Sequence, residues 1–243
     1  MDHNLDYNLQ LLDQYKVNRP GATEVVRQRL YDFTCYSAAG ATQFTFFALP
    51  IGQGKSSSSG ATSGTTTIPK TYADTNMEVA GVLPRPKSYL IESIEIIFEP
   101  GAISSTDNFS AITPSFFNST AAAAVLAQVA DVNLLRITGW FELYIGSKTY
   151  LWEAPLGVFP PKVHMEIDAA LSASGGTSAG VPLVGITAQH WGGRAYYMDP
   201  MITLESLQNF AAYIKFPTAQ ATPSGFNGRL GVAFDGVMYR LSQ

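Results

Sequence analysis

The sequence is poor in charge. Charged residues make up only 14% of the 243 residues, against about 25% in an average soluble domain, and the formal net charge is −4. No apolar run reaches the roughly 20 residues that a membrane-spanning helix needs. Hydrophobic residues still reach 46% and aromatic residues 12%. Composition therefore favours a subunit that covers much of its surface with partners, and the acidic balance argues against a dedicated nucleic-acid-binding protein.

Cysteine and histidine are also scarce, with one cysteine and three histidines. Cys35 cannot form an internal disulfide, which fits a reducing compartment. The stretch HMEID could place His164, Glu166 and Asp168 on one face of a strand, but a metal site needs about three convergent ligands, for example with His190 added. We favour the polar face of an edge strand, and we predict no metal and no cofactor.

The motif of nucleotide binding is incomplete. The stretch IGQGKSSSSG contains Gly54-Lys55-Ser56, the second half of a phosphate-binding loop, but Leu49 stands where the motif requires its first glycine. Small residues and a proline follow instead of the helix that would hold the phosphates. We therefore predict that residues 51–69 form a surface loop without nucleotide affinity.

A catalytic site is equally hard to assemble from the sequence. Glu92, Glu95 and Glu99 lie on a predicted strand, and paired carboxylates can hydrolyse glycosidic bonds, but their separation is set by the fold. We interpret them as solvent or interface positions and predict that the protein is not an enzyme.

The N-terminus lacks the basic region of a secretory signal. Leu5, Leu9 and Leu12 recur at helical spacing before Arg19-Pro20-Gly21 breaks the pattern, and TEVVRQRLYDF then reads as a second helix with Thr23 as its N-cap. The sequence thus predicts a helical arm over residues 1–40. This arm is amphipathic and nearly neutral, so it lies either on a neighbouring protein surface or on its own domain.

From residue 41 to 243 the pattern predicts about seven to nine antiparallel strands. Among them are QFTFFALP, NFAAYIKFP, KTYLWEAPLG after a Gly146-Ser147 turn, and GRLGVAFDGVMYRLSQ, where Asp235-Gly236 is a turn or a bulge. The stretch SYLIESIEIIFEPG would have Leu90, Ile94, Ile96 and Phe98 on one face. The stretch LLRITGWFELYIG would have Leu135, Ile137, Phe141, Leu143 and Ile145 facing the core and Trp140 facing away. One helix is predicted, STAAAAVLAQVADVN.

Long uneven connections between such strands favour an all-β antiparallel β-sandwich, a single jelly roll. A double jelly roll would need about sixteen strands. The stretch QHWGGRAYYMDP gathers Trp191, Tyr196 and Tyr197 in a glycine-containing loop. Such aromatic loops occur in carbohydrate sites and at protein interfaces, and we favour the interface.

Three stretches, DTNMEVAGVLPRPKSYLIESIEIIFEPG, GWFELYIGSKTYLWEAPLGVFPP and GVAFDGVMYRLSQ, resemble small jelly-roll capsid proteins of tailless icosahedral bacterial viruses. The resemblance covers most of residues 72–241. It implies a major capsid protein made in the host cytoplasm that forms capsomers and an icosahedral shell in the virion, with no cofactor or active site. Its expected partners are further copies, other virion proteins and, where a lipid layer lies beneath the shell, that membrane.

The near-neutral arm departs from basic capsid arms that hold a genome, so strong direct nucleic-acid binding is not expected. We expect the assembly interface to include these residues: Leu5, Leu9, Leu12, Trp140, Trp191, Tyr196 and Tyr197. Two alternatives stay open. One is a carbohydrate-binding β-sandwich module or viral fibre domain that uses residues 189–200, and the other is a β-sandwich glycoside hydrolase.

Overall fold

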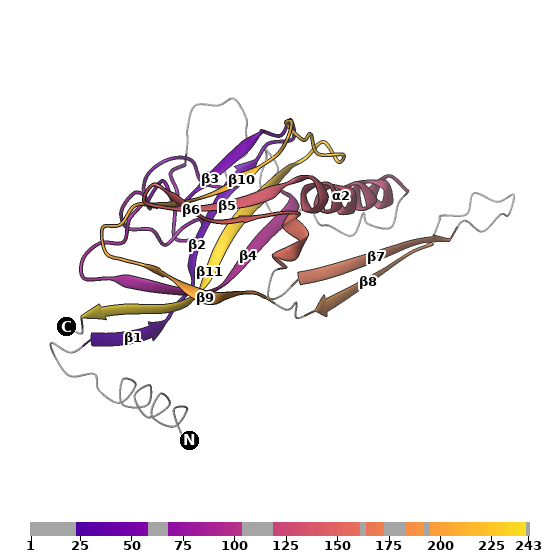
Figure 1. Ribbon diagram of the computed structural model, residues 1–243. Coiled ribbons are helices and arrows are strands. Elements are labelled where there is room, and N and C mark those ends of the chain that lie inside the picture. The colour runs from indigo at the N-terminus through magenta and orange to yellow at the C-terminus, as the bar shows by residue number, and fades with distance from the viewer. Residues whose placement is uncertain are drawn as a thin grey trace, which may run out of the picture.

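A computed structural model describes residues 23–57, 68–103, 119–160, 164–172, 183–191 and 195–241 (Figure 1). One antiparallel sheet contains β1 (Thr23–Arg27), β2 (Leu30–Tyr36), β4 (Ser88–Ile103), β9 (Tyr196–Leu204) and β11 (Asn227–Leu241). A second contains β3 (Gln43–Phe46), β5 (Trp140–Ile145), β6 (Lys148–Glu153) and β10 (Phe210–Lys215). A separate ribbon pairs β7 (His164–Ser172) with β8 (Leu183–Trp191). Within these residues the helices are α2 (Ser119–Thr138) and the 3-10 turn η3 (Leu156–Val158).

The strands of the two sheets pair in nested order. Strand β2 pairs with β11, β3 with β10, β4 with β9, and β5 with β6, always antiparallel. Successive pairs fall alternately in the five-stranded and the four-stranded sheet, and the β11–β4 and β10–β5 pairings join the pairs within each sheet. The predicted all-β, antiparallel class is therefore confirmed. No helix among the described residues is long and apolar enough to cross a membrane.

The hydrophobic core lies between the two sheets. Strand β10 alternates as predicted, with Phe210, Ala212 and Ile214 buried and the residues between them half-buried. Rings from the two sheets meet in the core: Tyr36 of β2 stacks on Phe44 of β3 with centroids 4.8 Å apart. Burial of such aromatic side chains from both sheets is the main force that holds the layers together.

In β4 a bulge changes which residues face the core. Ile91 pairs with Gly236 and Ser93 with Asp235, so Glu92 is the extra residue of the bulge. Of the two alternatives predicted for Asp235-Gly236, a turn or a bulge, the structure has the irregularity within a strand. Because a bulge shifts the two-residue alternation by one position, Ile91 is fully buried and Leu90 only half-buried. The prediction for Ile94 and Ile96 is confirmed, and that for Leu90 is wrong.

The predicted helix exists but is longer than expected. α2 continues through Leu135 and Ile137 to Thr138, so the strand expected there begins only at Trp140. Leu135 is buried from the helix, whereas Ile137 is 73% exposed, and its assignment to the core was wrong. The helix ends at Thr138, and only glycine fits at position 139, because a Cβ there would lie 2.6 Å from the Leu156 side chain. Phe141, Leu143 and Ile145 are buried as predicted.

The helix predicted for TEVVRQRLYDF is also wrong. Residues 23–27 and 30–36 are strands β1 and β2, which pair one after the other along β11. Their two tyrosines, one phenylalanine and two adjacent valines suit a strand surface better than a helix. The predicted arm therefore cannot continue as a helix to residue 40. Leu5, Leu9 and Leu12 lie outside the described residues.

Loops between β3 and β4 close one end of the sandwich through buried polar contacts. Ser56 Oγ donates to Asp74 Oδ2 at 2.8 Å, and the Ser57 backbone N–H donates to Asp74 Oδ1 at 2.9 Å. The Lys70 ammonium lies 2.5 Å from Asp32 Oδ1, with both side chains almost fully buried. The predicted loop is confirmed where it is described, since residues 51–57 contain turns but neither helix nor strand. Its serines bind a carboxylate of the chain itself.

Candidate functional site

The outer face of the four-stranded sheet carries a row of aromatic and polar side chains. Strand β5 contributes Trp140, Glu142 and Tyr144, which alternate with the buried residues Phe141 and Leu143. Residues that pair directly across antiparallel strands lie on the same face. The pairing of β10 and β6 with β5 therefore adds these residues to the row: Ala211, Tyr213 and Lys215 from β10, and Thr149 and Trp152 from β6.

Glu142 is the polar centre of this face. Its carboxylate accepts hydrogen bonds from Lys215 Nζ at 2.7 Å, Trp140 Nε1 at 2.8 Å and Tyr144 Oη at 3.0 Å. The Glu142 side chain is 9% exposed and that of Lys215 26%. Burial alone would raise the pKa of Glu142, but the three donors outweigh burial and hold the pKa below its ordinary value. The same bond to Glu142 raises the pKa of Lys215.

Two tyrosine rings flank the ion pair. Tyr144 and Tyr213 meet edge to face with centroids 5.4 Å apart, and the Lys215 ammonium lies 5.9 Å and 5.4 Å from their respective centroids. Such cation–π contacts fix the ammonium against the rings. Beside them runs an open groove of about 570 Å³ whose lining includes Gln43, Thr45 and Asn209. The charges of Glu142 and Lys215 thus neutralise each other within this face, and tyrosine rings lie on either side of them.

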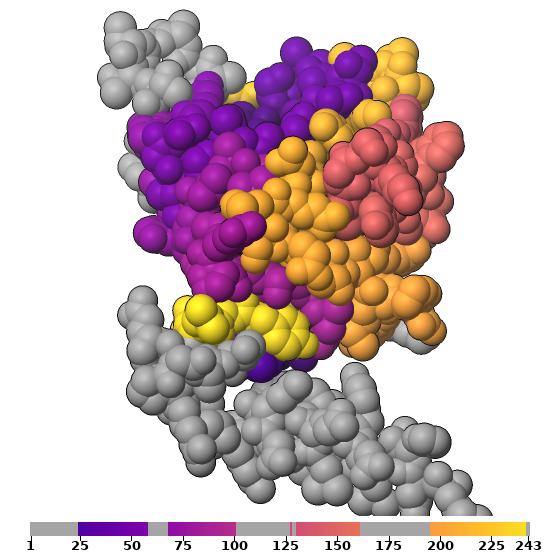
Figure 2. Space-filling model, turned by 60° about the vertical axis from the view of Figure 1, so that its left-hand side comes forward, coloured from indigo at the N-terminus to yellow at the C-terminus, as the bar shows by residue number. Residues whose placement is uncertain are grey.

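The aromatic surface continues onto the sheet edge. Trp152 of β6 is 74% exposed and Tyr150 is 51% exposed. On β9, the edge strand of the other sheet, Tyr197 and Met201 are exposed as well. Figure 2 shows the pink β5–β6 hairpin directly beside the orange segment that contains β9 and β10. We call the outer-face row together with Tyr150 and Trp152 the aromatic face.

The predicted interface residues divide into three groups. Trp140 faces outward as predicted, and Tyr197 is exposed, but Tyr196 turns inward and its ring lies 4.6 Å from that of Phe159. Trp191 ends β8, and its side chain lies outside the described part. The predicted glycine-containing loop is largely strand, because β8 extends to Trp191 and β9 begins at Tyr196.

Trp152, Tyr150 and Tyr213 were not predicted as site residues. A signal was present, because KTYLWE and NFAAYIK place aromatic residues between or beside core positions. Glu142 and Lys215 are 73 residues apart, so no local pattern could pair them.

The other candidate residues are held in structural contacts or cannot be assembled into a site. Glu92 pairs with Arg27 at 2.7 Å, Glu99 with Arg229 at 3.3 Å, and Glu95 with Arg29. In the ribbon, His190 pairs with Met165 and so opposes neither His164 nor Glu166. The side chains of these ribbon residues lie outside the described part. Cys35 is half-buried, and burial raises the pKa of its thiol.

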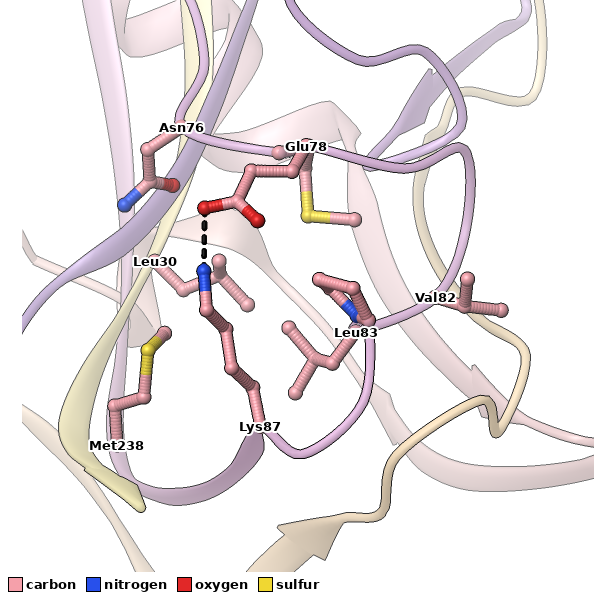
Figure 3. A pocket seen from close by; sticks show the side chains of 9 residues that line it. Leu30, Asn76, Glu78, Val82, Leu83, Lys87 and Met238 are labelled. Atoms are coloured by element: carbon pink, nitrogen blue, oxygen red, sulfur yellow. Dashed lines mark hydrogen bonds and ion pairs between the residues drawn. The ribbon is translucent and has the colours of Figure 1, made fainter. Parts of the chain in front are cut away.

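A small cavity lies under the loop between β3 and β4 (Figure 3). Its volume is about 20 Å³, and its lining includes Leu30, Met77 and Met238. The ion pair between Lys87 and Glu78 crosses it (Figure 3). A cavity of this size holds roughly one water molecule, which excludes it as a ligand site.

No protein-family model matches the chain, and no curated protein or solved structure is significantly similar to it.

Proposed function

We propose that this chain is a capsid protein with a single jelly-roll fold, which self-assembles into an icosahedral shell around a viral genome. A jelly roll is an antiparallel sandwich of eight strands in which one long hairpin of paired strands is rolled up, so that successive pairs fall in alternate sheets. The nested pairing of β2 with β11, β3 with β10, β4 with β9 and β5 with β6 has this order. Strands β7 and β8 are then an insertion, and β1 extends β2.

The observation that carries the shell function is the aromatic face, because a fold alone does not imply a function. Interface centres are enriched in aromatic residues and depleted of free charge. The aromatic face exposes Trp152 and Tyr150, and its central carboxylate is already neutralised by Lys215. A surface with exposed aromatic rings and little free charge makes few favourable contacts with water and is suited to binding a second protein surface.

A carbohydrate-binding module is the second candidate. The groove of about 570 Å³ favours it, because Tyr144, Tyr213, Gln43 and Asn209 line one open channel. Aromatic rings and amide groups together are suited to a neutral sugar. This function predicts a monomer that binds glycans through the groove, whereas a shell subunit buries the aromatic face against other copies.

Assembly of the purified chain tests the proposal. Sedimentation velocity over a hundredfold concentration range, followed by negative-stain microscopy of the fast-sedimenting fraction, should show closed particles of uniform diameter. A glycan array run in parallel should show no binding. A chain that remains monomeric throughout that range and retains a glycan on the array would contradict the shell function and support the alternative.

A further inference from the structure

The inference concerns β6, which forms one edge of the four-stranded sheet. Only β5 pairs with β6 among the described strands, so its other side presents backbone groups that can accept another strand. Lys148, Thr149, Tyr150 and Trp152 are all exposed on this strand. An aromatic, accessible edge of this kind is usually protected or occupied in a native protein.

A bulge in β6 makes the order of its inner-facing and outer-facing residues symmetric about Leu151. Leu151 pairs with Leu143 and Thr149 with Tyr144, so Tyr150 is an extra residue without a partner on β5. Thr149 and Trp152 therefore both lie on the outer face, although a regular strand would place residues three apart on opposite faces. Leu151 lies between them on the inner face. If Tyr150 is left out, inner-facing and outer-facing residues alternate along β6 in the same order whether the strand is followed from Lys148 or from Glu153.

The two ends of β6 carry charged residues of opposite sign at symmetric positions. Lys148 begins the strand and Glu153 ends it, and both pair with core-facing residues of β5, Ile145 and Phe141. Lys148 is exposed and makes no ion pair with any described residue. Glu153 is half-buried and lies near the Tyr196 hydroxyl, whose pKa is raised by burial and by this carboxylate.

We propose that two copies of the chain pair through β6, antiparallel, about a two-fold axis at Leu151. In this pairing Leu151 opposes its counterpart, Thr149 opposes Trp152 of the second copy, and Lys148 opposes Glu153 of the second copy. Each opposed pair shares a face, and the two four-stranded sheets join into one. A two-fold contact of this kind is self-complementary. The inference rests on the proposed self-assembly and names its contact.

The bulge does not prevent pairing on the free side. Strand β4 carries its bulge at Glu92 and is paired by β11 on one side and by β9 on the other, where the ladder is interrupted between Ile91–Ile202 and Ser93–Tyr197 and then resumes. Strand β11 carries an irregularity at Asp235-Gly236; β4 pairs with it on one side, and on the other side its partner changes there from β2 to β1. Bulged strands at interior positions are therefore a regular feature of this molecule.

Charge reversal with rescue tests the proposal in the full-length chain. Lys148→Glu places two carboxylates opposite each other at both ends of the ladder, and Glu153→Lys does the same with two ammonium groups. Like charges directly opposite each other destabilise strand pairing, so each single variant should weaken dimerisation about tenfold or more by sedimentation velocity. The double variant Lys148→Glu/Glu153→Lys restores opposite charges and should return to within about threefold of the wild-type constant.

Lys55→Glu is the matched control, because Lys55 is exposed, lies outside β6 and undergoes the same change of charge. It should leave dimerisation unchanged. Thermal unfolding of every variant separates loss of folding from loss of pairing; Lys148→Glu should melt like the wild type because Lys148 makes no described ion pair. Unaltered dimerisation in both single variants, or failure of the double variant to recover, would overturn the proposal.

The outcomes also separate this contact from the proposed function. Wild-type dimers that respond to charge reversal but never form closed particles would uphold the β6 contact and overturn the shell function. Closed particles that form equally well with Lys148→Glu would overturn the β6 contact alone. A wild-type chain that stays monomeric at every concentration would overturn both.

Discussion

Two lysine–carboxylate pairs in this chain share their chemistry and differ in their surroundings. Lys70 and Asp32 lie 2.5 Å apart inside the loop-covered end of the sandwich, with side chains 5% and 1% exposed. Lys215 and Glu142 lie 2.7 Å apart on the aromatic face, where they are 26% and 9% exposed. The first pair attaches a loop to the interior, and the second neutralises a surface.

The pKa values of the two carboxyl groups shift in opposite directions. Burial raises the pKa of Asp32, even though Lys70, the Phe47 backbone N–H and Thr75 all favour its ionised form. Burial acts on Glu142 too, but its donors prevail and the pKa falls. Desolvation therefore dominates in the interior, and hydrogen bonding dominates at the face. Similar ion pairs can thus differ in what they contribute to folding.

The largest expected effect is that of Lys70→Ala. The substitution leaves the Asp32 carboxylate buried without its counter-charge, and such losses destabilise proteins by about 3–5 kcal/mol. Lys55→Ala, on the exposed part of the same loop, should stay within about 0.5 kcal/mol of the wild type. Urea unfolding at pH 7 measures both. Equal stability of the two variants would mean that the interior pair does not hold the loop.

Lys215→Ala should cost less than Lys70→Ala. Glu142 keeps the donors Trp140 and Tyr144, so the loss should not exceed the about 1.5–3 kcal/mol that one hydrogen bond to a charged group contributes. Lys215→Met is the matched control, since it keeps the apolar stem against the tyrosine rings and removes only the charge. If Lys215→Ala proved as damaging as Lys70→Ala in urea unfolding, the distinction between the two pairs would fail.

The pH dependence should differ in sign between the two carboxyl groups. Glu142 has a lowered pKa, so its stabilising contribution is present above its ordinary value of 4.5 and is lost as the pH falls through the lowered value. Asp32 has a raised pKa, so its contribution is present below its ordinary value of 3.8 and is lost as the pH rises through the raised value.

Unfolding free energies of Asp32→Asn and Glu142→Gln, measured against the wild type from pH 3 to pH 7, test these signs. The advantage of the wild type over Glu142→Gln should shrink toward acid, and its advantage over Asp32→Asn should shrink toward neutral pH. Parallel pH profiles for the two variants would show that one environment governs both groups.

The smallest effect on stability is expected for Trp152→Ala. The side chain is 74% exposed, so the free energy of unfolding should change by about 0.5 kcal/mol or less. Assembly should nevertheless be lost, because the substitution removes the most exposed tryptophan of the aromatic face. Sedimentation velocity with Ile137→Ala as control, a similarly exposed apolar residue on α2, decides whether the effect belongs to this face. Normal assembly of Trp152→Ala would remove the face from the interface.

Sequence reasoning succeeded where a local pattern had one physical meaning. The alternation in β10 and in Phe141–Leu143–Ile145 could only bury one side of a strand, and both are oriented as predicted. It failed where the pattern was ambiguous, because Leu135 and Ile137 fit a strand face as well as a helix, and α2 continues through both of them to Thr138. The reversal at Leu90 required a bulge that pairing with β11 and β9 defines.

The candidate site was less predictable than the fold. Trp140 was found because alternation placed it opposite the core. The partner of Glu142 could not be found in this way, since Lys215 reaches it only through the β10–β5 pairing. The helix expected over residues 23–33 failed for the same reason: β1 and β2 are strands because β11, some two hundred residues later, pairs with them.

The position of β11 sets the order in which the protein can be completed during synthesis. β11 lies between β4 on one side and β1 and β2 on the other. The five-stranded sheet therefore lacks the strand that joins these parts until residues 227–241 have left the ribosome. Until then β2 and β4 have no strand between them, and their apolar faces stay exposed. Pairing of β2 with β11 joins residues far apart in the sequence, and such pairings form slowly. Nascent chains of this protein should therefore be the form that most depends on chaperones.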